Sequence, residues 1–212
     1  MKKIDDYIPS HLKDSIDINA KIQMLIEEFD KAAAKADIVI QKNVIKNLGQ
    51  LGVVKRDKVV PLLLSQLEND ELASCVIEQL GLIGDTSVIP FLVPEVNNSR
   101  VDIRVAVAHT LGFLGADNLI PYITKLLNDI DEKVRSASAT ALSHFVDEKV
   151  VSILVKTAIS DPSISVRANA SSSLMTLVIS SPPLGDELLE IFKKVKQEQS
   201  SQIFCNELEH VI

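Results

Sequence analysis

The sequence contains no tryptophan, and aromatic residues make up only 4% of its 212 positions. Leu, Ile, Val and Ala therefore supply most of the apolar side chains, as expected where thin helices pack closely side by side. No run of about 18 apolar residues occurs, so we expect no membrane-spanning segment. The two basic residues near the start are not followed by an apolar stretch, which argues against a secretory signal and predicts a cytoplasmic protein.

Residue patterns that would indicate catalysis, a cofactor or a metal are equally scarce. The sequence has no P-loop, no GxGxxG motif, no GxSxG motif and no His–Glu dipeptide. Cys75 and Cys205 lie far apart, so we expect Cys75 to be a small core residue and Cys205 to lie at the surface or in a cap. We therefore expect a protein that is not an enzyme, with no catalytic residue, no cofactor and no metal site.

Charge is distributed unevenly along the chain, whose formal net charge is −7. Residues 58–132 hold four basic and eleven acidic residues, whereas the segments on either side are nearly balanced. A nucleic-acid-binding protein needs a basic stripe to contact phosphates, and this chain lacks one in its middle. The charge therefore disfavours a nucleic-acid partner, and it favours either a basic partner or simple solubility.

An internal repeat is marked by a leucine that recurs every 31 or 32 residues. Apolar or small residues recur eight and four positions before this leucine and three positions after it, which places all four columns on one helical face. This helix is the first, helix A, of two helices expected in each repeat. The anchoring leucines are Leu48, Leu80, Leu111, Leu142 and Leu174.

Glycine and proline predict where helix A ends and the second helix, B, begins. A glycine at the end of helix A is expected to adopt the left-handed conformation that closes a helix. A proline is expected in the first turn of helix B, and a capping residue stands four positions before it. The glycines are Gly52, Gly84 and Gly115, the prolines Pro61, Pro90 and Pro121, and the caps Asp57, Thr86 and Asp117.

An arginine stands seven residues before the anchoring leucine in three repeats, at Arg104, Arg135 and Arg167. Stacked repeats would align these side chains, and acidic residues in the turns between repeats could pair with them. We therefore expect a structural ladder of ion pairs rather than a ligand site.

Helix pairs of about 31 residues with the pattern D…VR..A…LG.LGD…P…L resemble HEAT-like repeats, of the short type found in the phycobilisome lyase family. The resemblance implies an all-α fold, a right-handed α-solenoid of about five helix pairs in a single domain. The repeats would cover residues 36–198. Residues 1–35 would hold an N-terminal segment and cap helix, and residues 199–212 a C-terminal cap helix, because the ends of a solenoid need a polar outer side.

In solenoids of this kind the B helices usually line the concave side. One row on these helices is apolar to aromatic with charged neighbours, as in protein interfaces, while the adjacent residue of each helix faces the core. The sequence leaves open that the row instead packs one B helix against the next. The candidate protein-binding residues are Leu62, Phe91, Tyr122 and Ile153, together with Lys125, Asp129 and Lys156 on neighbouring turns.

Three roles suit an acidic, non-catalytic solenoid that binds a protein. The charge favours an immunity- or antitoxin-type protein that inhibits a basic nuclease toxin, since an acidic surface speeds capture of a basic partner. Alternatives are a bilin lyase-like chaperone subunit, which would act on a tetrapyrrole and its carrier protein, and a structural adaptor in a larger assembly. No motif indicates the partner's identity or the oligomeric state.

Overall fold

The computed structural model describes residues 17–181, 183 and 190 of the chain. Within these residues all regular structure is helical, as the repeat pattern predicted, and no helix is long and apolar enough to cross a membrane. The helices divide between Val88 and Ile89 into two compact units. We refer to residues 17–88 as the N-unit and to residues 89–181 as the C-unit. The predicted C-terminal cap helix and Cys205 lie outside the described residues.

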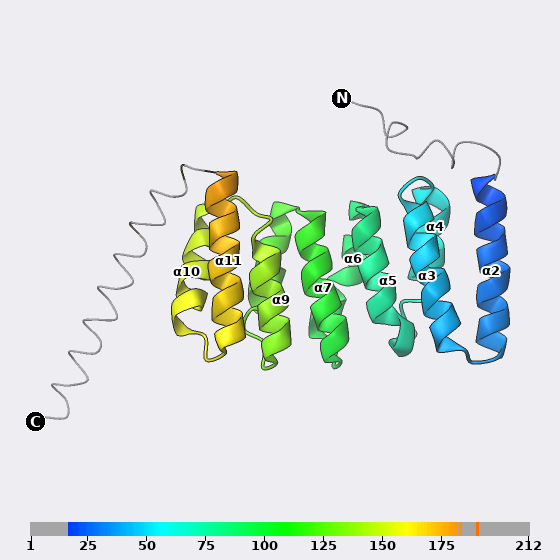
Figure 1. Cartoon of the computed structure of the whole chain (residues 1–212), viewed down its shortest axis with the longest axis horizontal. Coiled ribbons are helices and arrows are strands. Elements are labelled where there is room, and N and C mark those ends of the chain that lie inside the picture. The colour runs from blue at the N-terminus through cyan, green and yellow to red at the C-terminus, as the bar shows by residue number, and fades with distance from the viewer. Residues whose placement is uncertain (1–16, 182, 184–189, 191–212) are drawn as a thin grey trace, which may run out of the picture. The chain divides into compact units, whose positions relative to one another are not determined.

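In the N-unit, the predicted N-terminal cap helix is α2, which packs against the first A helix, α3. The second A helix, α5, packs against α3 in turn, and the B helix α4 contacts both of them (Figure 1). The bounds are α2 Ile18–Ala34, α3 Ile38–Gly52, α4 Arg56–Leu64, α5 Asp70–Ile83 and the 3-10 turn η2 Thr86–Val88.

In the C-unit, the A helices α7, α9 and α11 lie side by side, and the B helices α8 and α10 pack against them. The B segment before α7 is short and irregular, since a single α-turn, α6, leads into a 3-10 turn, η3. The bounds are α6 Ile89–Leu92, η3 Pro94–Asn97, α7 Val101–Leu114, η4 Asp117–Leu119, α8 Ile120–Leu126, α9 Glu132–Leu142, α10 Glu148–Ser160 and α11 Ile164–Ser180.

The predicted columns of helix A form the core of both units. All five anchoring leucines are at most 5% exposed, and the column four residues earlier is at most 1% exposed. Three members of the predicted columns depart from this pattern, since Ile40 is 39% exposed and Leu51 and Leu114 are half-buried. Cys75 is buried as predicted, and burial raises the pKa of its thiol, which makes it a poor nucleophile.

Helix A ends at or directly before the predicted glycine in all three repeats, but the predicted left-handed conformation is present only at Gly84 and Gly115. Gly84 and Gly115 close α5 and α7 with φ angles of 68° and 63°, a conformation that disfavours any residue with a Cβ. Gly52 is the last residue of α3, but its φ is not positive. A Cβ at Gly52 would collide with Ile83 and Val59, so glycine is required there for close helix packing.

The proline prediction is confirmed for Pro90 and Pro121, each the second residue of its helix. The prediction is wrong for Pro61, because α4 begins early enough to place this residue inside the helix. None of the three predicted caps is the residue directly before an α-helix. The side chain of Asp57 lies within the first turn of α4, while Thr86 and Asp117 begin 3-10 turns that precede the α-helices by three residues.

Candidate protein-binding surface

Two arginines of the C-unit form the predicted ladder. Arg104 holds the carboxylate of Asp129 through Nε–Oδ2 and Nη2–Oδ1 hydrogen bonds of 2.7 and 2.8 Å. Arg135 holds Asp161 in the same way, at 2.9 and 3.1 Å. In each case Nη1 donates to two backbone carbonyls of the preceding turn. Each arginine therefore joins its own repeat to the turn that begins the next one.

The two carboxylates of the ladder are held in their charged form. The hydrogen bond from Arg135 lowers the pKa of Asp161, with further help from the N–H of Ser163. Burial alone would raise the pKa of Asp129, but hydrogen bonds from Arg104 and from a backbone N–H outweigh it, and the pKa is lowered overall. Because these charges are matched and bidentate, they act as structural links and not as free acidic groups.

The predicted B-helix row contains two exposed aromatic side chains in the C-unit. Phe91 is 52% exposed and Tyr122 is 37% exposed, although the next residue of each helix, Leu92 or Ile123, is fully buried. Ile153 is half-buried. The adjacent column was predicted to face the core, and all of its members are 0% exposed: Leu63, Leu92, Ile123 and Leu154.

An open groove of about 460 Å³ lies beside this row in the C-unit. It is formed by α8, α10 and the turns that follow them, and we call it the B-helix groove. Leu127, Ile153 and Pro162 give it apolar surface. The buried hydroxyl of Thr124 also lines it and has no hydrogen-bond partner among the described residues. The groove thus offers apolar contact area, while the Thr124 hydroxyl itself is buried beneath its surface.

The charge of the B-helix groove differs from what the acidic composition suggested. Its acidic lining residues are Asp129 and Asp161, and both are neutralised by the ladder. Lys156 also lines the groove and forms no ion pair within the described part of the chain. Lys125, on α8, donates a hydrogen bond to the side chain of Asn97. The unmatched charge in the groove is therefore positive.

Of the seven candidate residues, Leu62 lies in the N-unit and the other six lie in the C-unit. Leu62 is half-buried and lines a separate cavity of about 220 Å³ between α2, α3 and α4, with Ile26, Phe29 and Asp30. Asp129, Ile153 and Lys156 meet in the B-helix groove. Sequence reasoning missed Thr124 as part of this groove, since no pattern sets one partly buried threonine apart from others.

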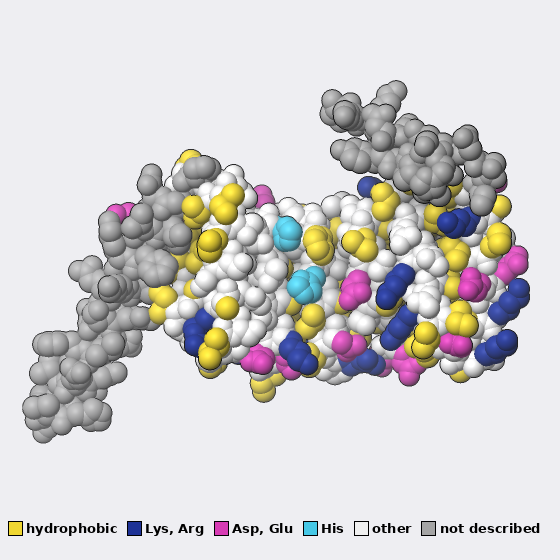
Figure 2. Space-filling model, viewed as in Figure 1, with side chains coloured by type: hydrophobic (Ala, Val, Ile, Leu, Met, Phe, Trp, Pro, Cys, Tyr) yellow, Lys and Arg dark blue, Asp and Glu magenta, His cyan; other side chains and the backbone are white. Residues whose placement is uncertain are grey.

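The opposite, A-helix face carries little charge in the C-unit. In Figure 2, charged side chains gather over α2, α3 and α5, whereas uncharged surface covers much of α9 and α11. Phe113 is 60% exposed on α7, and its ring lies 5.3 Å from that of His144 in the turn after α9. Among the residues that the structure describes, no group of three or more His, Cys, Asp or Glu side chains could hold a metal ion.

Comparison with known proteins relates the C-unit to a repeat family. The family model for HEAT repeats matches residues 89–175. No curated protein matches the chain by sequence. A chain in the structure of the complex of CpcE and CpcF of phycocyanin lyase, from Nostoc sp. PCC7120, matches with a TM-score of 0.58 and 22% identity. The match covers 73% of this chain and 98% of that one, and at this identity it shows the fold alone. The protein is thus an all-α, HEAT-like repeat solenoid whose residues 89–175 match the HEAT repeat family.

Proposed function

We propose that the chain is a non-catalytic solenoid that binds a protein partner on the B-helix face of the C-unit. The supporting observation is the exposure of Phe91 and Tyr122 next to fully buried neighbours. Exposed aromatic rings contribute a large apolar contact area at little entropic cost, which is why aromatic residues are enriched among the residues that dominate binding energy. The B-helix groove beside them would take a further segment of the partner.

The test is the double variant Phe91→Ala/Tyr122→Ala in the full chain, compared with Phe113→Ala on the A-helix face. We expect the double variant to keep its helicity and to lose about 2 kcal/mol of binding energy toward the partner recovered from the source cells, roughly a thirtyfold loss of affinity. Phe113→Ala should bind as the unchanged chain does. Equal weakening by both variants would contradict the proposal, and loss of folding in the double variant would mean that the row belongs to the core.

A lyase-like chaperone subunit is a more specific alternative, and the structural match favours it. The matched chain belongs to a complex of two proteins of phycocyanin lyase, so a two-protein assembly is consistent with the same fold. A subunit of this type should bind a linear tetrapyrrole. Titration with biliverdin, followed by its visible absorbance, should then show saturable binding, and an unchanged spectrum would count against this role.

An immunity-type inhibitor of a basic nuclease toxin is a second specific form, suggested by the net charge of −7. Neither the family match nor the structural match names a toxin inhibitor, and the B-helix groove itself carries unmatched positive charge. If this role holds, association with a basic partner should slow strongly as salt is raised, because electrostatic steering is screened. An association rate that is insensitive to salt would exclude capture by long-range charge.

A further inference from the structure

In the described part of the N-unit, no B helix stands between the cap helix α2 and the first A helix, α3. Residues 35–37 link these two helices directly (Figure 1), whereas α4 stands between α3 and α5 in the chain and α10 between α9 and α11. Both of these B helices pack against the A helix before them and the A helix after them. The connection from α2 to α3 thus leaves the place of a B helix to be taken by other residues.

An apolar cavity of about 220 Å³ lies at this place, between α2, α3 and α4, and we call it the N-unit cavity. Among the residues that line it, Ile45, Leu48 and Leu63 are at most 5% exposed. Ile26 and Phe29 of α2 also line it and are half-buried. A smaller cavity of about 150 Å³ is large enough to hold a benzene ring. The N-unit cavity therefore has room for an aromatic side chain.

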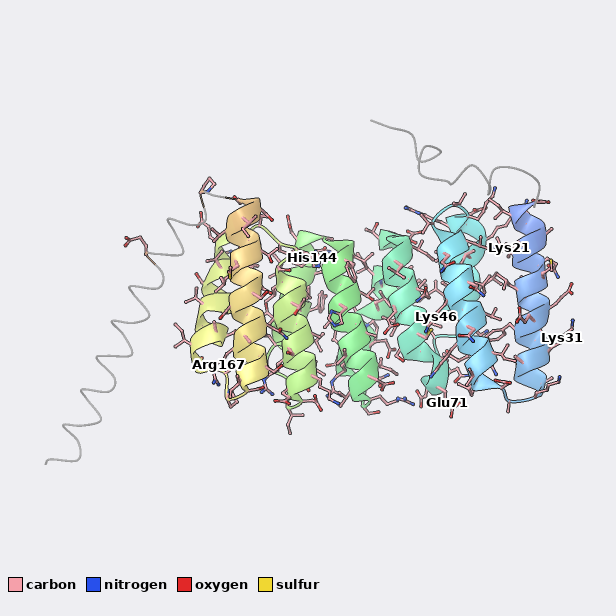
Figure 3. All side chains as sticks on the ribbon, viewed as in Figure 1. Lys21, Lys31, Lys46, Glu71, His144 and Arg167 are labelled. Carbon is pink, nitrogen blue, oxygen red and sulfur yellow. The ribbon has the colours of Figure 1, made fainter. Side chains whose placement is uncertain are left out.

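The helix α2 has the polar and apolar sides of an A helix. Lys21 and Lys31, which are labelled in Figure 3, are exposed, whereas Ile22 and Leu25 are at most 7% exposed. Apolar side chains on one side only are typical of a helix that packs against the rest of a protein. Since each later A helix follows a B segment or an A helix of the same stack, the sequence before α2 was searched for the B-segment pattern.

That pattern stands directly before α2, in residues 5–9, which lie outside the described residues. It reads DDYIP, and it matches DKVVP, TSVIP and DNLIP at residues 57–61, 86–90 and 117–121. The shared order is Asp or Thr, any residue, an apolar or aromatic residue, Ile or Val, and then Pro. The spacing agrees as well, because α2 begins nine residues after Pro9 and α5 begins nine residues after Pro61. The sequence therefore predicts one more B segment, directly before α2.

The aligned columns indicate which side chains of this segment would be buried. Tyr7 stands two positions before the proline, in a column that is 0% exposed in the other three segments: Val59, Val88 and Leu119. Lys13 stands four positions after the proline, in a column that is exposed in all three: Ser65, Pro94 and Lys125. The segment departs from the others two positions after the proline, since His11 stands where they carry a fully buried Leu or Ile.

We propose that residues 5–16 pack onto the N-unit as a B segment and fill the N-unit cavity with the ring of Tyr7. Eleven residues separate Tyr7 from Ile18, and eleven separate Ile18 from Phe29. A helical segment that runs antiparallel to α2 therefore brings the ring to the level of Phe29, because both helices rise equally per residue. This placement concerns the N-unit alone and does not depend on the proposed protein-binding function.

The walls of the N-unit cavity suit a tyrosine. Its ring would cover the half-buried apolar side chains of Phe29 and Leu62, which removes apolar surface from water. Asp30 and Gln66 also line the cavity and offer hydrogen-bond partners for the hydroxyl. Because the segment is joined to α2 at Asp17, only a short loop has to close, and the entropic cost is small. The segment would thus cover the apolar end of the stack, as a solenoid requires.

The first test introduces a carboxylate at the buried and at the exposed column of the segment in the full chain. Tyr7→Asp would place a charge in an apolar cavity, which is unfavourable, so the segment should leave it. Hydrogen exchange, measured by mass spectrometry, should then be at least about tenfold faster in α2 and α4, with α9 and α11 unchanged. Lys13→Asp is the matched control, because it alters the charge by more, and it should leave the exchange of α2 and α4 unchanged.

A second test locates the segment. The chain contains no tryptophan, so Tyr7→Trp reports the surroundings of this position alone. Its emission should lie at shorter wavelength than that of Lys13→Trp and be quenched less by acrylamide. Adding Leu62→Gln at the cavity wall should remove this difference. Adding Leu82→Gln, at a residue of α5 that is 62% exposed and does not line the cavity, should preserve it.

Equal exchange in Tyr7→Asp and Lys13→Asp would overturn the proposal, since the ring would then contribute nothing to α2 and α4. An emission that responds alike to Leu62→Gln and Leu82→Gln would place the segment outside the cavity and overturn it too. If slow exchange in the unchanged chain is lost on dilution together with a dimer, a second copy supplies the segment and the proposed occupant is wrong. Should Tyr7→Asp fail to fold, Tyr7→Ser and Lys13→Ser give the same comparison without an added carboxylate.

Discussion

The N-unit and the C-unit are built on the same repeat, but the contacts that join successive repeats differ within the two units. In the C-unit, Arg104 and Arg135 join successive repeats through Asp129 and Asp161. At the equivalent column of the N-unit stand Gln41 and Ala73, which are 4% and 2% exposed and form no ion pair in the described structure. The HEAT-repeat match covers residues 89–175, so it coincides with the unit that carries the ladder. The stacking of A helices therefore does not itself require the arginines.

Close packing at glycine is common to both units. A Cβ on Gly49 of α3 would lie 2.8 Å from Cβ of Gln79, and a Cβ on Gly112 of α7 would lie 2.9 Å from Cα of Ala141. Both glycines directly follow an anchoring leucine, so the same column brings neighbouring A helices together in each unit. The ladder is therefore an addition to this shared packing, and its removal should affect the C-unit alone.

Removal of one ladder arginine is expected to have the largest effect. Arg135→Met would leave the carboxylate of Asp161 buried without its partner, since the two side chains are only 13% and 8% exposed. We expect the C-unit to lose about 3 kcal/mol of stability, because an unmatched buried charge is costly. Hydrogen exchange of α9 to α11 should accelerate, while that of α3 and α5 should change little.

The matched control is Arg100→Met, which breaks an ion pair with Asp102 in the same unit. That pair is exposed, with side-chain exposures of 40% and 49%, so its loss should cost at most about 0.5 kcal/mol. If Arg135→Met costs no more than Arg100→Met, the ladder does not stabilise the C-unit.

Alanine at the two matched glycines should produce a smaller effect that differs between the units. Gly112→Ala would press against the backbone of Ala141, so the helices α7 and α9 must move apart, at a cost of about 2 kcal/mol. Gly49→Ala would press against the side chain of Gln79, which can shift in part, so we expect about 1 kcal/mol. Thermal unfolding, followed by circular dichroism, measures the loss of stability in each variant. A larger loss for Gly49→Ala would mean that the N-unit is the more tightly packed of the two.

Of the three perturbations, which are arginine removal, alanine at the glycines and acid, we expect acid to reduce the stability of the C-unit least. The folded pKa values of Asp129 and Asp161 are lowered from their ordinary value of 3.8, so the folded chain binds fewer protons than the unfolded chain near that pH. Their contribution to stability is fully present above about pH 4 and is lost as the pH falls through the lower folded pKa values. We expect a loss of about 1 kcal/mol in the C-unit at pH 3.

Urea unfolding between pH 3 and pH 6 measures this dependence. Asp161→Asn should be less stable throughout but less sensitive to pH, because the group that titrates has been removed. In the N-unit the described structure has a lowered carboxyl pKa at Asp85, where N–H and hydroxyl hydrogen bonds from Ser87 stabilise the charged form of an exposed group. If hydrogen exchange at pH 3 accelerates equally in both units, the ladder is not the source of the acid sensitivity.

Much of the fold could be predicted because its signals are local. The spacing of the anchoring leucines and the columns around them depends only on helical geometry within one repeat. The leucines and the column four residues earlier are buried as predicted. Helix ends were predicted less well. α3 ends at Gly52 as predicted, but this glycine is needed for close packing and not for a left-handed turn. α4 begins at Arg56, earlier than predicted, so Pro61 lies inside the helix.

The candidate site was predictable only in outline. The sequence left open whether the B-helix row lies at the surface or packs between helices. In the structure Phe91 and Tyr122 are exposed, whereas Leu62 and Ile153 are half-buried. It also placed Asp129 among the residues of a binding surface, where the structure shows its carboxylate bound to Arg104. Each ladder arginine precedes its aspartate by 25 or 26 residues in the sequence. Only the structure shows that the turns lie close enough for these two side chains to pair.

The sequence by itself determined the helical repeat, its core columns and the alignment of the three arginines, because each follows from the periodicity of a single helix. The tertiary structure decided which acids the arginines hold, which glycine is needed for close approach and which charges remain unmatched. These features depend on distances between repeats, that is, between side chains that lie far apart in the chain. The ion pair between Arg135 and Asp161 comes from this level, because it joins a helix to the turn that begins the next repeat.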